Sequence, residues 1–162
     1  MAIVTPFPRW PDLRWTVARP TRLRHLTPPA SEALQRLTDF SPERTRNWPR
    51  IADNNLIVHD RGEGWAEVTE GKRIAWERER YTWDATALTV SAVTLNSNLW
   101  APGSGWNYTI LPAGAGSRIE VTAVRNGYGI KGKLVGLALS LFGKRVVTSS
   151  TTAALAAPKR PT

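Results

Sequence analysis

The densest group of residues that could do chemistry is "WERERYTWD", residues 76 to 84. Side chains alternate between the two faces of a strand, so Glu77 and Glu79 share one face and Arg78 with Arg80 the other. The aromatic residues change parity across the segment, which predicts a bulge or bend near Arg80. One of these arginines could orient a ligand carbonyl or carboxylate, because a guanidinium offers a planar fork of donors. Cross-strand ion pairing on the solvated face is the alternative that the pattern favours.

Three further segments carry polar groups. "NSNLW" supplies Asn96 and Asn98 at like parity, and either could hydrogen-bond a ligand oxygen, although Asn also ends strands and starts turns. Tyr108 could present its hydroxyl to a ligand. Arg145 falls inside the apolar arc of a C-terminal helix, where it either meets an amphipathic ligand or extends past the helix into water. The candidate catalytic residues are Arg78, Tyr108, Asn96 and Arg145, and the sequence leaves open whether the protein is an enzyme.

Several kinds of site are excluded by the composition. The chain has no cysteine and two histidines, which removes thiol catalysis and leaves few ordinary ligands for a transition metal. No phosphate-binding loop, nucleophile elbow or metal-spaced cluster of histidines and carboxylates occurs. We therefore expect no metal site and no cofactor. The first residues show no export signal, so we expect a cytoplasmic location.

The chain of 162 residues has a formal net charge of +9. This length suits one domain. The basic excess lies at the two ends, and such a surface attracts phosphate groups, so a nucleic acid or an anionic membrane is one class of partner. An Arg-rich and Ala-rich composition also arises from a GC-rich genome without functional cause. We favour a solvated basic surface, which makes a nucleic-acid partner the weaker interpretation.

The elements before residue 55 are short. Residues 1 to 13 show no clear period and are interpreted as an irregular arm, and residues 14 to 24 as a poor or edge strand broken by a proline. A short amphipathic helix is predicted to begin with Thr27 as its N-cap and Pro28 in its first turn. A second short helix in "SPERTRNW" is predicted to end at Trp48, because a proline follows it.

After residue 55 the hydrophobic period changes to that of a strand. Six alternating segments are separated by short turn-like sequences such as "RGEG" and "APGSG". This pattern predicts an antiparallel meander. In the last two segments, apolar residues alternate with polar ones, so one face of the sheet is expected to be apolar and the other wet.

The stretch "KGKLVGLALSLFGKRVV", residues 131 to 147, predicts a one-sided C-terminal helix. Its apolar run is shorter than the roughly 20 residues that a bilayer span requires. Leu134, Ala138 and Leu141 fall within one arc, as in a helix that lies on an apolar surface. We therefore expect no transmembrane segment here, and we interpret residues 158 to 162 as a frayed tail.

This order of elements resembles the SRPBCC superfamily, also called START-like or polyketide cyclase/dehydrase-like. The phrases "NWPRI", "WERERYTWD", "SNLWAPGSGW" and "GIKGKLVGLALSLFG" are similar to those of bacterial members without an assigned activity, and the resemblance covers residues 14 to 157. It implies a single α+β domain with a helix-grip fold. In that fold a curved antiparallel sheet of six to seven strands wraps on a long C-terminal helix, with two short helices after the first strand.

The resemblance also implies a deep, mostly apolar pocket between the sheet and the C-terminal helix. We expect this pocket to bind a hydrophobic or amphipathic small molecule that is lipid-like or polyketide-like. One alternative is a polyketide cyclase or dehydratase that uses Arg, Tyr or Asn in the pocket, and a second is a basic protein that binds nucleic acid or an anionic membrane. The expected pocket residues are Trp76, Trp83, Asn98, Trp106, Ile110, Ile119, Val121, Leu134, Ala138 and Leu141.

Overall fold

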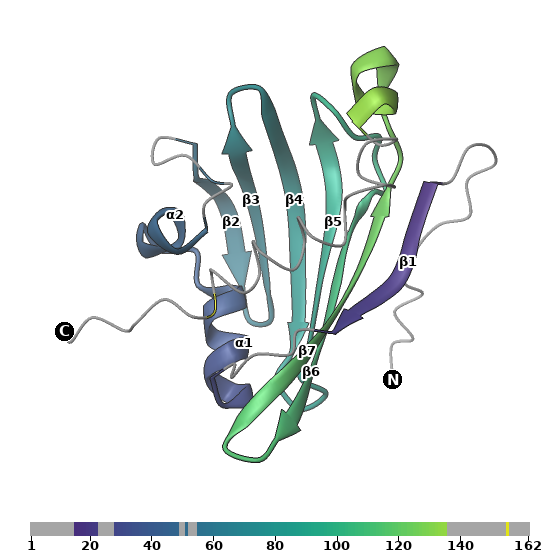
Figure 1. Cartoon of the computed structure of the whole chain (residues 1–162). Coiled ribbons are helices and arrows are strands. Elements are labelled where there is room, and N and C mark those ends of the chain that lie inside the picture. The colour runs from purple at the N-terminus through teal and green to yellow at the C-terminus, as the bar shows by residue number, and fades with distance from the viewer. Residues whose placement is uncertain (1–14, 23–27, 49–50, 52–54, 136–154, 156–162) are drawn as a thin grey trace.

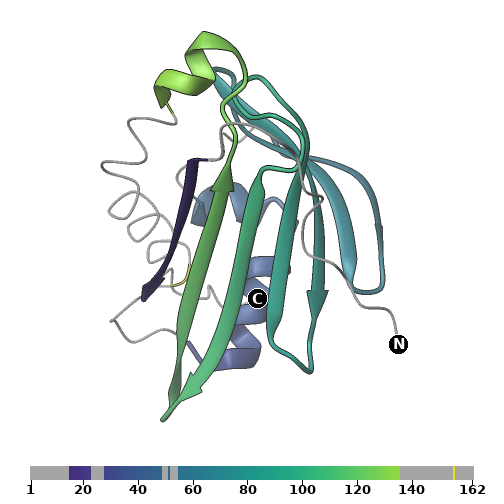
Figure 2. The same cartoon turned by 90° about the vertical axis from the view of Figure 1, so that its right-hand side faces the viewer.

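The computed structural model describes residues 15–22, 28–48, 51, 55–135 and 155, and the side chains of all these except 15–22. Seven antiparallel strands form one curved sheet (Figures 1 and 2). The elements are β1 Trp15–Arg22, α1 Ala30–Thr38, α2 Glu43–Asn47, β2 Ile57–Gly62, β3 Trp65–Lys72, β4 Ala75–Asp84, β5 Thr89–Ser97, β6 Gly105–Ala113 and β7 Gly116–Arg125.

The strand order confirms the predicted meander. From β2 to β7, each strand pairs with the next one along the chain, and β1 completes the sheet beside β7 (Figure 1). The predicted edge strand is therefore β1. Its pairing with β7 shifts between Val17 and Thr21, because Pro20 in this interval has no N–H to donate to a neighbouring strand.

The start of α1 corrects one prediction. The N-cap is Pro29 rather than Thr27, and no side chain caps the helix. Pro28 precedes another proline, and the ring of that proline disfavours a helical conformation in the residue before it. In the first hydrogen bond of the helix, the Ala33 amide therefore donates to the Pro29 carbonyl oxygen at 2.9 Å. The second helix ends before Trp48, as predicted.

Apolar side chains gather on the face of the sheet that packs against α1, which we call the inner face. Ile110, Ile119 and Val121 are buried there, at the alternating positions that the sequence pattern indicated. Helix α1 contacts β5, β6 and β7 and contributes Leu34 and Leu37 to the same core. The core therefore lies between α1 and the inner face of the sheet, to which β3, β4, β5, β6 and β7 all contribute buried residues.

After β7 the chain forms an isolated bridge between Trp100 and Gly127, and the backbone is then helical over residues 129–135. This helical start stands at the end of the sheet where β5 and β7 finish (Figure 1). The remainder of the predicted C-terminal helix, with Ala138, Leu141 and Arg145, lies outside the described residues, as do the arm 1–13 and the tail 158–162. No helix within the described ranges is both long and apolar enough to cross a membrane.

Candidate ligand-binding site

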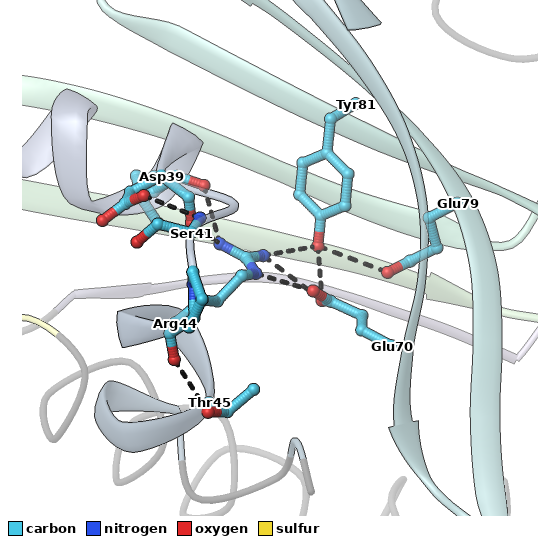
Figure 3. Close-up of polar contacts among 9 residues, drawn as sticks. Asp39, Ser41, Arg44, Thr45, Glu70, Glu79 and Tyr81 are labelled. Carbon is cyan, nitrogen blue, oxygen red and sulfur yellow. Dashed lines mark hydrogen bonds and ion pairs between the residues drawn. The ribbon is translucent and has the colours of Figure 1, made fainter. Parts of the chain in front are cut away.

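Arg44, in α2, carries a buried charge to the inner face. The residue is 3% exposed, and its Nε donates to Glu70 Oε2 at 2.7 Å (Figure 3). Its Nη1 donates to the Leu37 carbonyl oxygen at 3.1 Å, and the guanidinium lies 4.5 Å from the centre of the Phe40 ring. Burial disfavours the charge, but Glu70 and Tyr81 together outweigh it, so the pKa of Arg44 is raised above its ordinary value. Arg44 is a permanent cation.

Tyr81 connects this ion pair to a second acid, Glu79. The Tyr81 hydroxyl donates to Glu70 Oε1 at 2.8 Å and accepts from Arg44 Nη2 at 3.0 Å. Glu79 Oε2 lies 3.3 Å from the same hydroxyl (Figure 3). A phenol has one proton to donate, and the shorter contact assigns it to Glu70. A hydrogen bond between Glu79 and Tyr81 therefore requires a proton on Glu79.

Burial favours that protonated form of Glu79. The residue is 2% exposed. Loss of solvation, followed by the nearby charge of Glu77, raises the pKa of Glu79 well above its ordinary value near 4.5, and Arg125 only partly opposes this shift. The Oε1 atom of Glu79 has no hydrogen-bond partner among the described residues. Burial therefore favours the protonated form of Glu79, and one of its oxygens is open to a further contact.

Both tyrosines of the inner face are neutral. Burial, followed by the charges of Glu70 and Glu79, raises the pKa of Tyr81 well above its ordinary value. Burial and then Glu79 raise the pKa of Tyr108 in the same way. Their hydroxyls therefore keep their protons and can both donate and accept hydrogen bonds.

Arg125, the last residue of β7, forms a second buried ion pair. The residue is 3% exposed, and its Nη1 donates to Glu77 Oε2. Glu77 Oε2 also accepts from the Thr94 hydroxyl at 2.9 Å. The guanidinium carbon lies 3.8 Å from the centre of the Trp106 ring and 5.3 Å from that of Trp100. Two aromatic rings and one carboxylate thus fix its position.

The Nε and Nη2 atoms of Arg125 are buried and have no hydrogen-bond partner in the described part of the chain. Together with Glu79 Oε1, they are open polar atoms beside an apolar core. Apolar walls with a few convergent polar groups are typical of small-molecule sites. We call the following residues the buried polar cluster: Arg44, Glu70, Glu77, Glu79, Tyr81, Tyr108 and Arg125.

Several residues predicted to line a pocket are brought together on or against the inner face. Tyr108 is buried and belongs to the polar cluster. Trp83 and Trp106 are partly buried and pack against the core that contains Tyr108. The remaining residues of this group are Ile110, Ile119 and Val121.

Arg78 lies on the opposite face of the sheet. Its side chain is 44% exposed, and its Nε donates to Glu67 at 2.7 Å. Arg80 is likewise exposed, and its guanidinium lies 3.9 Å from the centre of the Trp65 ring. The structure therefore does not bring Arg78 to the cluster, and the ion-pair interpretation is the one that its contacts match.

A bulge lies beside β4, but the extra residue belongs to β5 and not to β4 near Arg80 as predicted. The pairing of β4 with β5 shifts between Arg78 and Glu79, whose partners are Asn96 and Thr94. Leu95 is therefore the unpaired extra residue of a bulge. Because of it, Thr94 and Ser97 are both buried although their numbers differ in parity.

The other predicted site residues within the described chain lie away from the buried polar cluster. Asn96 is exposed. Asn98 accepts from the Trp76 amide and donates to the Ile74 carbonyl oxygen, both at 3.0 Å, so its amide ties the turn before β4 to the end of β5. By alternation Trp76 shares the face of Arg78 rather than that of Tyr81. Leu134 is 62% exposed and does not join the core.

Of the seven residues in the cluster, only Tyr108 was predicted as a site residue. For three of the six that were missed, the sequence contained a signal. Arg125 continues the alternation of Ile119, Val121 and Ala123, which assigns it to the inner face. Glu79 has the parity of Tyr81. Arg44 follows Leu37 and Phe40 at helix-like spacings. For Arg125 and Glu79 the strand periodicity was correct and the charge argued against burial. For Arg44 the spacing was coincidental, because α1 ends at Thr38 and α2 begins at Glu43.

No group of three residues that could hold a metal ion occurs within the described ranges. The polar cluster instead offers arginine donors, a buried carboxyl group and two phenols. These groups can bind a ligand oxygen or transfer a proton.

Known structures share this architecture at low sequence identity. The Zhui aromatase/cyclase from a Streptomyces species has a TM-score of 0.71 at 11% identity, covering 89% of this chain and 93% of its own. A START superfamily protein from Mycobacterium smegmatis has a TM-score of 0.61 at 12% identity, covering 88% and 99%. The protein TTHA0849 from Thermus thermophilus has a TM-score of 0.65 at 16% identity, covering 87% and 100%.

No protein-family model matches the chain, and no curated protein matches its sequence. At these identities the structural matches show the fold. They confirm the architecture that the element order and the quoted phrases predicted. The chain therefore has a START-like helix-grip fold.

Proposed function

We propose that the protein binds a hydrophobic or amphipathic small molecule on the inner face of its sheet, beside the buried polar cluster. The observation that carries the proposal is the pair of open polar groups in an apolar setting, Glu79 Oε1 and the Nε and Nη2 atoms of Arg125. An unsatisfied buried donor or acceptor costs about 1–3 kcal/mol, and a ligand oxygen relieves that cost. The structural neighbours include a START superfamily protein and an aromatase/cyclase, which agrees with this class of function.

An uncharged fluorescent probe tests the proposal without help from the basic surface. N-phenyl-1-naphthylamine should bind saturably, with an affinity that changes little between about 50 and 200 mM salt, because no phosphate contact drives it. Ala123→Trp should weaken this binding at least about 10-fold, since Ala123 is buried on the inner face opposite Trp106. Thr122→Trp, on the other face of the same strand, is the matched control and should bind normally.

Two results would overturn the proposal. One is the absence of saturable probe binding to the wild type. The other is equal binding by the two tryptophan variants, with circular dichroism showing that both are folded. A nucleic-acid or anionic-membrane binder would instead show affinity for its polyanion that falls steeply with salt. A cytoplasmic location stays a prediction from the sequence.

A second candidate, a cyclase or dehydratase acting on a polyketide-like carbonyl compound, is favoured by one observation. Glu79 is a buried acid whose pKa is raised well above its ordinary value by burial, as a general acid at neutral pH requires. Of the predicted catalytic residues within the described chain, Tyr108 lies with Glu79, whereas Arg78 and Asn96 do not. Glu79→Gln should then lower turnover at least about 100-fold while probe binding is unchanged. Full turnover in this variant would exclude the mechanism.

A further inference from the structure

We propose that the Nε–Nη2 edge of Arg125 binds the carboxylate of an amphipathic ligand. This inference rests on the proposed function and makes it more specific, because it assigns the chemistry of the polar head. Arg125 is 3% exposed. The two donor atoms of this edge have no hydrogen-bond partner among the described residues.

The geometry of the arginine fits a carboxylate. Its Nη1 atom is occupied by Glu77, which leaves Nε and Nη2. These two atoms form one edge of the planar guanidinium, and their parallel N–H bonds match the two oxygens of a carboxylate. The Trp106 ring, 3.8 Å from the guanidinium carbon, lies against the group and limits its movement. The edge is thus held ready for a planar partner.

The surrounding charges disfavour a ligand with more than one negative charge. Arg44 is paired with Glu70, and Arg125 has one carboxylate partner, Glu77. Burial raises the pKa of Glu79, which favours its protonated form and limits its repulsion of a ligand anion. A phosphate dianion would need a second unpaired cation, and the described part of the cluster offers only this one guanidinium edge. A single carboxylate matches the two open donors of Arg125.

The apolar part of the ligand has a place in the same arrangement. Ala123 and Val121, the inward residues of β7 before Arg125, are buried and apolar. A chain attached to the carboxylate would follow this row toward Ile119. The site therefore fits a molecule with a carboxylate at one end and a hydrocarbon body.

Decanoate and decanamide separate a carboxylate site from a purely hydrophobic one. They have the same length, but only decanoate accepts two charge-assisted hydrogen bonds. By isothermal titration calorimetry, the wild type should bind decanoate about 10-fold to 100-fold more tightly than decanamide, as expected for hydrogen bonds to a charged group. Arg125→Gln should abolish this preference while circular dichroism shows that the variant is folded. Arg78→Gln, on the outer face, is the matched control and should keep the preference.

The outcomes distinguish the two proposals. Equal affinity of the wild type for decanoate and decanamide overturns the carboxylate site and leaves hydrophobic binding intact, as expected if water occupies the edge. Failure of the wild type to bind decanoate, decanamide and the fluorescent probe overturns the proposed function itself. If Arg125→Gln does not fold, Arg125→Lys replaces it, because lysine keeps the charge but not the fork. A preference retained in the folded variant also contradicts the inference.

Discussion

Arg44 and Glu70 are joined by two hydrogen bonds, from Nε to Oε2 at 2.7 Å and from Nη2 to Oε1 at 3.3 Å. One partner comes from a helix of five residues, α2, and the other from strand β3. The pair therefore fixes a short helix to the sheet beside the buried polar cluster. Its removal should affect both stability and the shape of the site.

Replacing either partner of this ion pair alone should strongly destabilise the protein. Arg44→Met leaves a mostly buried carboxylate, and Glu70→Gln leaves a buried guanidinium, so each variant should lose about 3–5 kcal/mol of unfolding free energy. The double variant should lose clearly less than the sum of the two, because neither charge is then left without its partner. Urea unfolding of the four proteins measures this coupling. Additive losses would contradict the account.

The exposed pair Arg46 and Glu43 serves as the control for that cycle. Both side chains are more than half exposed. Such pairs on a helix contribute about 0.3–0.5 kcal/mol. Arg46→Met should therefore change stability much less than Arg44→Met, although the two arginines lie in the same short helix.

Glu79→Gln should stabilise the protein, and the gain should depend on pH. Burial raises the pKa of Glu79 in the folded state, so the folded protein binds this proton more tightly than the unfolded chain. The stability it contributes is complete below the ordinary pKa near 4.5 and is lost as pH rises toward the folded pKa. Glutamine has no such proton.

Unfolding free energies of both proteins, measured across this pH range, test the assignment. The difference between Glu79→Gln and the wild type should be smallest near the ordinary glutamate pKa and should grow by up to about 1.4 kcal/mol per pH unit above it. A variant that is less stable than the wild type at every pH would show that Glu79 is an ionised, paired carboxylate.

Gly132→Ala should destabilise the start of the C-terminal helix. A Cβ atom at this position would lie 2.1 Å from the Leu99 carbonyl oxygen, so the helix or the loop must move. We expect a loss of about 1–3 kcal/mol, as for other overpacked positions. Lys133→Ala, at the next and exposed position, should change stability little. Equal effects of the two substitutions would contradict the close approach.

Arg78→Ala should have little effect on stability or on ligand affinity. Its ion pair with Glu67 lies on the solvated face, where such pairs are worth about 0–1 kcal/mol. A large loss of probe binding in this variant, with the fold retained, would place a functional arginine on the face opposite the cluster. Urea unfolding and fluorescence titration measure the two effects.

The sequence predicted the sheet well because alternation is a direct record of which face each residue occupies. It predicted the inward positions of Ile119 and Val121 by this rule. The same rule pointed to Arg125 and Glu79, but charged residues are rarely buried without partners. Their partners, Glu77 and Tyr81, were present in the sequence. However, the sequence does not show that Arg125 in β7 reaches Glu77 in β4, because these strands are not neighbours in the sheet.

Local patterns failed where two neighbouring residues interact. Thr27 is a residue type that often caps helices, but α1 begins only at Ala30, after two consecutive prolines. Asn98 has the parity of a ligand contact, yet it uses both ends of its amide to hold the turn before β4. Leu134 lies in the apolar arc of its helix and is exposed at the helical start. Each outcome depends on contacts that periodicity does not contain.

Isoleucine methyl spectra test the central claim most directly, because isoleucines mark both the inner face and the surface. Ile110 and Ile119 are buried on the inner face, whereas Ile74 and Ile130 are each 80% exposed. Titration with decanoate should shift the methyl signals of Ile110 and Ile119 in the wild type and much less in Ala123→Trp. Shifts confined to Ile74 and Ile130, or no shifts at all, would contradict a ligand site on the inner face.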